Sequence, residues 1–429
     1  MNEINKWFDE NSSDVWKIAE FIFENPELSL EEKKSSRCLA NFMEDQGFSI
    51  EWKVAGLETA FVATWGAGKP VLGFLAEYDA LPGLGQKPVD RRSEIEGCGH
   101  GCGHSVLGVG AAAAAVALKK ELELSGKSGT IKLFGCPAEE IMYGKIIMTE
   151  QGCFDDLDAA ITWHPSDVNR VGEDIYQAMD CKKFRFFGVT SHASGSPHLG
   201  RSALDAAELM NVGVNYLREH VTDDVRIHYT YLDAGVKPNI VPDFAQTSYY
   251  IRGNSRKHVD DASQRIERIA QGAALMTDTR YESELVSNCK ETKLNFTLLD
   301  TFYEAMTEVP VPKYTEEEIQ FAKSISEAAN LDNEGKYFDG LQKYERRAKD
   351  IYISTDVSNV SHKVPTVTLN AATACKGTPL HHWAFTAQTG STIGFKSMIY
   401  VAKCMALGGL KLIDNPEILA KAIDEHLNI

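Results

Sequence analysis

Residues 97–121 have the sequence GCGHGCGHSVLGVGAAAAAVALKKE, in which a glycine-rich loop runs directly into an apolar segment. From Ser105 to Glu121 the pattern predicts a helix, and positions 111–115 within it are all alanine. A helix that is apolar on every side is buried rather than laid on a surface. We therefore expect this helix to be covered by other elements and to pack against a sheet.

Short apolar and β-branched runs surround this helix in the sequence, as is typical of strands. They occupy residues 60–64, 71–76, 130–136, 159–163 and 366–370. Strands that alternate with helices predict a largely parallel sheet. The expected fold class is α/β, with a mixed, mostly parallel sheet flanked by helices, the last of them around residues 384–407.

The pattern changes from about residue 178, where the order becomes strand, helix, two strands, helix and strand. This β-α-β-β-α-β order is that of a ferredoxin-like α+β domain. Its elements are predicted at 181–189, 202–220, 225–232, 245–252, 259–276 and 279–287. We expect one domain formed by residues 1–177 and 293–429, with 178–292 inserted into it.

Length and charge restrict the possible partners. A chain of 429 residues favours two domains over one. With 44 Lys and Arg against 61 Asp and Glu, the formal charge is −17, and such a surface repels phosphate backbones and anionic lipid. We expect a small-molecule ligand, with neither nucleic acid nor a membrane as partner.

The cysteines and the first residues indicate the compartment. Nine cysteines, an odd number spread over a long chain, favour free thiols or metal ligands in a reducing environment. The first ten residues, MNEINKWFDE, lack the basic end and apolar run of a signal peptide. We expect a cytoplasmic protein.

The glycine-rich loop carries four soft or borderline metal donors, Cys98, His100, Cys102 and His104. Two cysteines and two histidines are enough in number for a closed structural zinc site. Donors only two residues apart in one tight loop seldom surround an ion tetrahedrally, because structural sites usually take their ligands from two separated pairs. The alternative is a site completed by donors from elsewhere in the chain.

Such donors follow three predicted strands. Glu77 and Asp79 come after the strand at 71–76, and Glu139 with Glu140 after the strand at 130–136. His164 follows the strand at 159–163. In an open α/β sheet, ligands bind at the carboxyl ends of the strands. We expect these side chains to converge there.

The adjacent pair Glu139 and Glu140 suits two different tasks, because successive residues of an extended segment point in opposite directions. One carboxylate can hold a metal while the other takes a proton from water. A bound metal lowers the pKa of its water from about 15.7 to about 7, so a carboxylate suffices as general base. The sequence has no nucleophile elbow, Walker loop or dinucleotide fingerprint that would offer another chemistry.

Four motifs together resemble the M20 family of metallopeptidases, in particular its amidohydrolase branch. They are AEYDALP at 76–82, HGCGH at 100–104, PAEE at 137–140 and the later His381. Within that branch, GRSALDA at 200–206 and ELMNVGVN at 208–215 look most like the B-type chains of p-aminobenzoyl-glutamate hydrolases. The resemblance implies a metal-dependent amidohydrolase that cleaves the amide bond of an N-acyl amino acid, such as p-aminobenzoyl-glutamate.

The resemblance also implies roles for residues of the larger domain, which would bind two divalent ions, zinc or manganese. Glu139 would be the general base, and Asp79 would orient a neighbouring ligand. The implied metal ligands are Cys102, His104, Glu140, His164 and His381.

For the inserted domain, the resemblance implies a lid and a dimerisation surface. His192 would reach a partner subunit's active site and stabilise the oxyanion, while Asn239 and Arg252 would hold the substrate's carboxylate. An arginine fork suits bidentate carboxylate binding. The expected assembly is a homodimer, or a hetero-oligomer with a related subunit.

Three positions depart from the family's pattern. Ser105 stands where related sequences have Asp or Asn, and Glu77 where many M20 peptidases have a histidine ligand. The run STD at 354–356 replaces the family's more usual glutamate-containing motif.

Two alternatives stay open. One is a dipeptidase that acts on dipeptides with unusual acyl groups, and the other is a non-catalytic protein with a structural zinc or redox site.

Overall fold

The computed structural model describes residues 2–332, 338 and 340–428, which divide into two compact units. Of these described residues, the first unit contains those within 2–174, 293–349 and 360–428, and the second contains 175–292 and 350–359. Residues 350–359 are predicted from the sequence to belong to the larger domain, whereas the structure groups this segment with the second unit. It is tied there by hydrogen bonds, from Ile351 N to Ile175 O at 3.1 Å and from Cys289 Sγ to Thr355 O at 3.0 Å.

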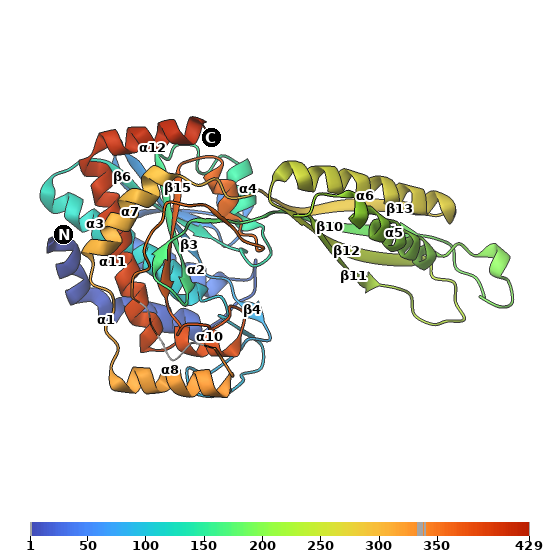
Figure 1. Cartoon of the computed structure of the whole chain (residues 1–429), viewed down its shortest axis with the longest axis horizontal. Helices are drawn as coiled ribbons and strands as arrows, with labels where there is room; N and C mark the ends of the chain where they lie inside the picture. The colour runs from blue at the N-terminus through green and yellow to red at the C-terminus, as the bar shows by residue number, and fades with distance from the viewer. Residues whose placement is uncertain (1, 333–337, 339, 429) are drawn as a thin grey trace. The chain divides into compact units, whose positions relative to one another are not determined.

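A seven-stranded sheet organises the first unit (Figure 1), in the order β1-β2-β6-β3-β7-β15-β8. The four strands β6, β3, β7 and β15 run parallel, and the outer strands pair antiparallel to their neighbours. The expected α/β fold with a mostly parallel central sheet is therefore confirmed. The strands are β1 (Ser49–Trp52), β2 (Phe61–Ala67), β3 (Val71–Glu77), β6 (Gly129–Cys136), β7 (Ala159–Ser166), β8 (Arg170–Val171) and β15 (Thr366–Ala372).

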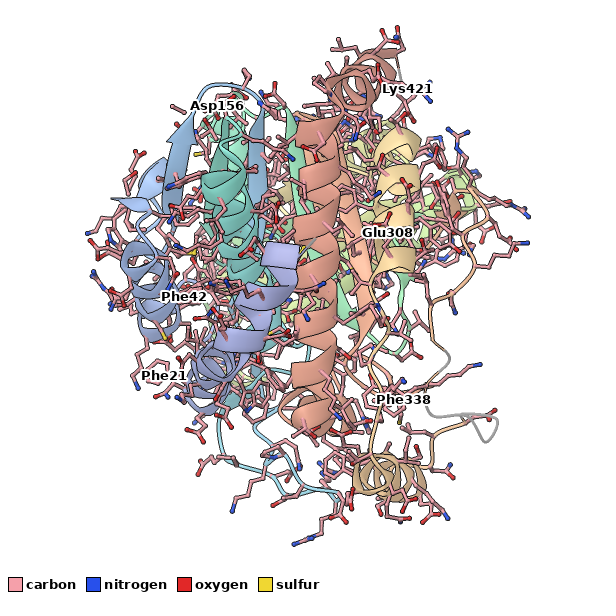
Figure 2. All side chains as sticks on the ribbon, turned by 90° about the vertical axis from the view of Figure 1, so that its left-hand side faces the viewer. Phe21, Phe42, Asp156, Glu308, Phe338 and Lys421 are labelled. Atoms are coloured by element: carbon pink, nitrogen blue, oxygen red, sulfur yellow. The ribbon has the colours of Figure 1, made fainter. Side chains whose placement is uncertain are left out.

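The predicted apolar helix is α3 (His104–Ser125), and every residue from His104 to Lys119 is buried. Figure 2 shows α3 beside α1 (Asn2–Glu24) and α11 (Thr392–Asp414) in a layer over the sheet. The indole Nε1 of Trp163, on β7, donates to Leu107 O at 2.9 Å and fixes α3 against the sheet. The other helices of this unit are α2 (Lys33–Asp45), α4 (Gly144–Glu150), α7 (Phe296–Glu308), α8 (Glu316–Ala328), α10 (Trp383–Thr389) and α12 (Pro416–Asn428).

The single helix expected around 384–407 is wrong, because the structure has two helices there, α10 and α11. The chain turns at Gly390, where a Cβ would lie 2.4 Å from the Phe23 ring. Ser391 then caps α11 by accepting a hydrogen bond from Ile393 N at 3.2 Å. A serine cap and a close ring contact end one helix and start the next.

The second unit contains a four-stranded antiparallel sheet in the order β11-β12-β10-β13, with α5 and α6 packed on one core. Along the chain the order is β10, α5, β11, β12, α6 and β13. The core contains Phe184, Tyr249 and Ile266. The bounds are β10 (Ala178–Phe187), α5 (Ala203–Leu217), β11 (Arg226–Asp233), β12 (Phe244–Gly253), α6 (Arg256–Met276) and β13 (Arg280–Cys289).

Several short elements complete the described part of the chain. They are β4 (Leu81–Pro82), β5 (Cys98–Gly99), β9 (Asp174–Ile175), β14 (Lys349–Asp350), α9 (Val357–Ser361) and the 3₁₀ turns η1 (Val54–Gly56), η2 (Pro197–Leu199) and η3 (Arg218–His220).

One helix of the described residues, α11, is long and apolar enough to cross a membrane, and 78% of its most apolar window is buried. Helices in protein cores can be equally long and apolar, and α11 contributes to the core of the first unit.

The close contact of α3 with β3 can be tested at Gly108, where a Cβ would lie 2.5 Å from the main-chain oxygen of Glu77. Because main-chain atoms cannot rotate away, Gly108→Ala is expected to lower the free energy of unfolding by about 1–3 kcal/mol, measured by chemical denaturation. Leu124→Ala is the control on the same helix, since Leu124 is 67% exposed. An equally stable Gly108→Ala protein would contradict this contact.

Candidate metal centre

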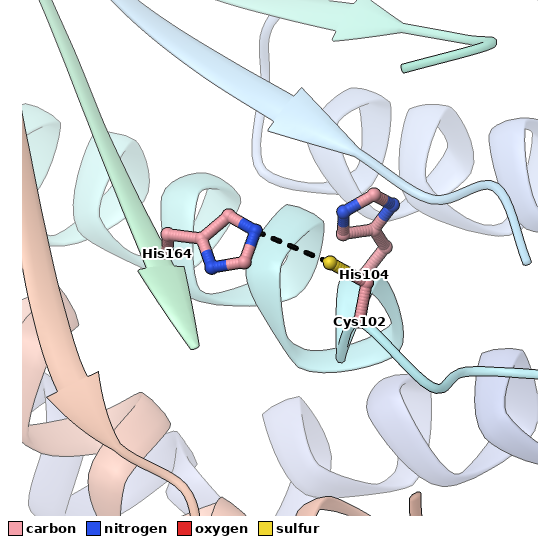
Figure 3. Close-up of side chains that lie close together, drawn as sticks. All are labelled: Cys102, His104 and His164. Atoms are coloured by element: carbon pink, nitrogen blue, oxygen red, sulfur yellow. Dashed lines mark hydrogen bonds between the residues drawn. The ribbon is translucent and has the colours of Figure 1, made fainter. Parts of the chain in front are cut away.

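The C-terminal edge of the sheet in the first unit gathers the predicted donors. Asp79 follows β3, Glu139 and Glu140 follow β6, and β7 carries His164 near its end. His104 is the first residue of α3, directly after the glycine-rich loop. In Figure 3, Cys102 and His164 face each other, with His104 beside them.

Three groups of donor atoms are close enough to hold a cation, and the atoms of each group lie within 4.8 Å of one another. All three groups belong to the first unit. They are Cys102 with His104 and His164, Cys102 with Glu140 and His381, and Glu77 with His104 and Glu139. The structure thus brings together all five residues that the sequence analysis names as ligands, and places Glu139 beside them.

Two histidines of the first group present the same ring nitrogen. Nδ1 of His104 donates to Asp79 Oδ1 at 3.0 Å, and Nδ1 of His164 donates to Pro165 O at 2.7 Å. When neutral, each ring then has its lone pair on Nε2, which is the usual arrangement for a metal-ligating histidine. His164 Nε2 lies 3.4 Å from Cys102 Sγ. Burial lowers the pKa of His164 to about 4, which keeps this nitrogen free of a proton at neutral pH.

Asp79 connects three parts of the site. Its carboxylate accepts hydrogen bonds from Ser29 Oγ at 2.8 Å and from Glu140 N at 2.9 Å, besides the bond from His104. Although burial opposes it, these bonds lower the pKa of Asp79. Asp79 therefore orients His104 and fixes the main chain at Glu140, and it is in none of the donor groups found among the described residues.

The glycine-rich loop points its donors in two directions. Cys98 Sγ donates to Pro26 O at 3.1 Å, and His100 Nε2 donates to Ile22 O at 3.1 Å. Neither belongs to a donor group among the residues described. The closed zinc site built from this loop alone is therefore wrong, because only Cys102 and His104 turn toward the sheet edge.

Two glycines make this loop possible. At Gly99 a Cβ would lie 2.0 Å from Leu84 O. Gly103 has φ of 83°, a left-handed conformation that glycine adopts without strain, and it directly precedes α3. The chain can therefore turn sharply from Cys102 into the helix that begins with His104.

Unsatisfied polar atoms show that a cation fits this edge. Glu77 Oε2, His104 Nε2 and Glu140 Oε1 are buried and form no hydrogen bond to another described residue, although the first two lie 3.3 Å apart. Burial of such atoms without a partner costs about 1–3 kcal/mol each, more when charged. Burial also raises the pKa of the Cys102 thiol and raises the pKa of Glu140 to about 7, so both groups need a cation to ionise easily. The thiolate, imidazole and carboxylate set suits zinc or manganese.

His381 is the least enclosed of the donors, with a side chain 52% exposed. Its main-chain N donates to Gly101 O at 2.9 Å, which ties it to the glycine-rich loop. Its Nε2 lies 3.5 Å from Glu140 Oε2. His381 thus closes the outer side of the centre.

The sequence motifs did not indicate Lys145 as the partner of Glu77. Lys145 Nζ lies 2.9 Å from Glu77 Oε1, and both side chains are almost fully buried. Although burial opposes it, Lys145 and His104 lower the pKa of Glu77. Glu77, which departs from the family's pattern, therefore forms a buried ion pair. The one signal in the sequence for its partner was a lysine within the apolar segment of α4.

Glu32 was not indicated either, although it supports the turn that carries Glu139 and Glu140. Its Oε1 accepts a hydrogen bond from Ala138 N at 2.9 Å, and its Oε2 accepts one from Thr59 Oγ at 2.8 Å. Ala138 has φ of 59°, a left-handed conformation that this bond helps to hold. No motif in the sequence singles out Glu32, because its partners come from distant segments.

Two further polar side chains at this edge of the sheet are buried, and each has an oxygen that forms no hydrogen bond to another described residue. Asn370 Oδ1 lies on β15, where Asn370 is the register partner of His164 on β7. Ser105 Oγ lies in the first turn of α3. The altered position 105 therefore supplies no hydrogen bond to the other described residues of the centre.

The three remaining predicted residues belong to the second unit, where they lie at two different ends. Asn239 O accepts a hydrogen bond from Ala193 N at 3.0 Å, so the main chains at His192 and Asn239 are adjacent. Arg252 lies at the far end of β12, donates to Ser354 Oγ at 2.9 Å and stacks over Tyr250. The ten residues of β12 span about 30 Å, so Asn239 and Arg252 of one chain cannot hold the same carboxylate.

Comparison with known proteins agrees with this geometry. Residues 73–382 match the family described as Peptidase family M20/M25/M40. The chain is 37% identical to the B chain of p-aminobenzoyl-glutamate hydrolase from Escherichia coli, over 96% of this chain and 92% of that protein. It is 28% identical to the Xaa-Arg dipeptidase of Mus musculus, over 96% and 88%. The crystal structure of an aminobenzoyl-glutamate utilization protein from Klebsiella pneumoniae has the same fold, with a TM-score of 0.67 and 17% identity over 94% of this chain and 98% of that one.

The buried carboxyl of Glu32 predicts a pH dependence of stability. Burial, with the nearby Asp79 carboxylate adding to it, raises the pKa of Glu32 to about 7. An acid with a raised pKa stabilises the fold fully below its unfolded pKa, and this contribution is lost as the pH rises through the folded value. Between pH 5 and pH 8, the wild type should therefore lose on the order of 2 kcal/mol relative to Glu32→Gln.

The measurement is the free energy of unfolding of chelator-treated protein at both pH values. The difference in unfolding free energy between wild type and Glu32→Gln cancels the contribution of the titratable groups that both proteins contain. Glu31→Gln is the control, because Glu31 is exposed next to Glu32 in the sequence. Parallel curves for wild type and Glu32→Gln would show that Glu32 ionises normally.

Proposed function

The chain belongs to peptidase family M20/M25/M40, and from this we propose that it is a metal-dependent amidohydrolase acting on N-acyl amino acids. The expected substrate is p-aminobenzoyl-glutamate or a close analogue, in line with the name of the 37% identical relative. The observation that carries the proposal is the convergence of Cys102, His104, Glu140, His164 and His381 at one sheet edge.

Two of the donor groups share Cys102, which supports a centre for two divalent ions. His104 and His164 would complete one position, and Glu140 with His381 the other. Zinc is favoured by the thiolate, and manganese is compatible with the carboxylate and imidazoles. When bound, such ions polarise an amide carbonyl and lower the pKa of water.

Glu139 would perform the proton transfers. It is 5% exposed, and its Oε2 lies 4.0 Å from His104 Nε2, beside the donors but outside the two groups that share Cys102. Its carboxylate would take a proton from the attacking water and deliver it to the leaving amine nitrogen. A positioned carboxylate contributes about 10²–10⁴-fold to such a reaction.

Asp79 would act as a positioning residue rather than as a ligand. By accepting the Nδ1 proton of His104, it directs the Nε2 lone pair toward the donor cluster. By accepting from Glu140 N, it also sets where the two glutamates stand. A carboxylate behind a ligating histidine fixes the ring and raises its basicity.

The inserted domain, 178–292, which lies within the second unit, is proposed to be a ferredoxin-like lid and dimerisation domain. His192 and Asn239 lie at one end of its sheet, and Arg252 at the other. They can serve one substrate only if two chains contribute, with His192 and Asn239 reaching the site of a second copy. His192 would then stabilise the oxyanion, while Asn239 of one copy and Arg252 of the other bind the substrate's carboxylate.

The assembly would be a homodimer through this domain, or a hetero-oligomer with a related chain. The latter is suggested by the names of the Escherichia coli relatives, which distinguish a B chain from an A chain of the same hydrolase. The expected location is the cytoplasm, where a free thiol such as Cys102 stays reduced.

A second candidate is a dipeptidase, favoured by the similarity to the Xaa-Arg dipeptidase of mouse. The two candidates differ in the group on the leaving side, a free glutamate or a basic amino acid.

A substrate panel tests the proposed activity and separates these candidates. With zinc or manganese added, purified protein is expected to release glutamate from p-aminobenzoyl-glutamate, followed by chromatography. Acetyl-glutamate and dipeptides ending in arginine complete the panel. Hydrolysis of the dipeptides alone would favour the second candidate, and no hydrolysis at all would contradict both.

Removal of the proton-transfer group should slow the reaction without loss of metal. Glu139→Gln is expected to lower kcat by about 10²–10⁴-fold with little change in KM, because the amide cannot accept a proton. Metal content, measured by mass spectrometry, should equal that of the wild type. The control is Glu150→Gln, an exposed position on α4.

Retention of turnover by Glu139→Gln in metal-replete buffer would refute its role as base. Loss of metal from this variant would instead make Glu139 a ligand, and would contradict the assignment as well.

Metal binding should depend on one cysteine of the loop and not on the other. The wild type is expected to hold two ions per chain and to lose its activity in chelator. Cys102→Ser should bind metal at least roughly tenfold more weakly, since a hydroxyl is a poor substitute for a thiolate. Cys98→Ser is the matched control, because Cys98 bonds to Pro26 O. Equal metal loss in both variants would contradict the donor assignment.

A further inference from the structure

A cavity of about 510 Å³ is lined by residues 97–100 of the glycine-rich loop. Its wall is formed by the end of α1, by the loop that includes Gly97 and Gly99, and by Thr386 with Gly390 at α10. No residue of the three donor groups lines it among the described residues. It is therefore a space separate from the metal centre.

The apolar part of this cavity could cover a ring or an alkyl chain. Phe23, Pro26, Pro88 and Ile95 line it. The Phe23 ring stacks on the imidazole of His100 with 6.4 Å between centroids and 29° between planes. An aromatic or alkyl group placed here would leave water for an apolar surface, which is favourable.

The charged part of the cavity is mainly anionic. Glu20 and Glu24 come from one face of α1, and Glu96 from the opposite loop, against a single cation, Lys87. None of the three carboxylates forms an ion pair with any residue in the described ranges. Exposed acidic residues alone are ordinary on a chain with a net charge of −17.

His100 provides the independent observation. It lines the cavity, is 1% exposed and donates from Nε2 to Ile22 O, which can only accept. In the neutral ring, Nδ1 is therefore a hydrogen-bond acceptor, and it has no partner among the residues described. A buried acceptor without a donor is destabilising until a donor reaches it.

We propose that this cavity is a second ligand site, which binds a small organic cation: an amine or guanidine attached to an aromatic or alkyl group. The three carboxylates and His100 Nδ1 can all accept hydrogen bonds, and a protonated nitrogen supplies several donors. The apolar residues hold the attached group. The ligand class is set by this pairing of acceptors with an apolar wall, and not by the chemistry of the metal centre.

The test compares two probes of the same shape, tryptamine and its neutral analogue tryptophol. Binding to the metal-loaded full chain is measured by isothermal titration calorimetry at about 0.15 M salt, which screens non-specific attraction. Tryptamine is expected to bind about tenfold more tightly than tryptophol, because its hydrogen bonds to carboxylates are charge-assisted. Equal affinity of the two probes, or no binding of tryptamine, would overturn the proposal.

Variants locate the bound probe. The double variant Glu24→Gln with Glu96→Gln should weaken tryptamine binding about tenfold and leave tryptophol binding unchanged. Glu10→Gln is the matched control, because Glu10 is an exposed glutamate of α1 outside the cavity. Unchanged tryptamine binding by the double variant, or an equal loss in Glu10→Gln, would show that the probe binds elsewhere.

A second variant acts on the buried acceptor. His100→Phe keeps a ring against Phe23 but removes Nδ1, together with the Nε2 hydrogen bond to Ile22 O, and it should weaken tryptamine binding more than tryptophol binding. Equal weakening of both probes would contradict a role for the nitrogen. None of these readouts depends on amide hydrolysis, so the outcome is independent of the proposed enzymatic function.

Discussion

The buried carboxylate of Asp79 is the constraint on which the centre depends. It lies just after β3 and joins His104 at the start of α3 to the main chain of Glu140 after β6. A buried carboxylate is tolerable only when hydrogen bonds replace its lost water. Those bonds fix three segments at once, so the same interaction that satisfies Asp79 also sets the direction of His104 Nε2.

The surroundings of Asp79 are rich in buried acids and poor in buried cations. Glu32, Glu77 and Glu139 are almost inaccessible, and Lys145 supplies a buried positive charge. Like charges in a poorly solvated space repel strongly, which adds to the effect of burial in raising the pKa of Glu32. Such an arrangement is costly without a cation and favourable with one. Divalent ions bound here would therefore reduce the electrostatic repulsion among the buried carboxylates.

One loop serves two different faces of the first unit. Cys102 and His104 turn to the sheet edge, whereas Cys98 and His100 bond to the end of α1 and the residues just after it. The separation depends on Gly99, whose place against Leu84 O leaves no room for a side chain. Four similar donors in a row thus become two ligands and two structural residues. His100 lines the separate cavity, and its Nδ1 has no hydrogen-bond partner among the described residues.

The sequence alone determined the α/β sheet, the buried helix after the loop and the convergence of donors at strand ends. These features follow from the order of apolar and polar residues within each element and from the alternation of strands with helices. Tertiary structure decided what depends on distant partners: the pairing of Lys145 with Glu77, the support of Ala138 by Glu32, and the helix break where Gly390 meets Phe23. It also placed Asn239 in the loop before β12 and Arg252 near the end of that strand. Periodicity reports which side of an element is buried, but not which residue from elsewhere in the chain lies against it.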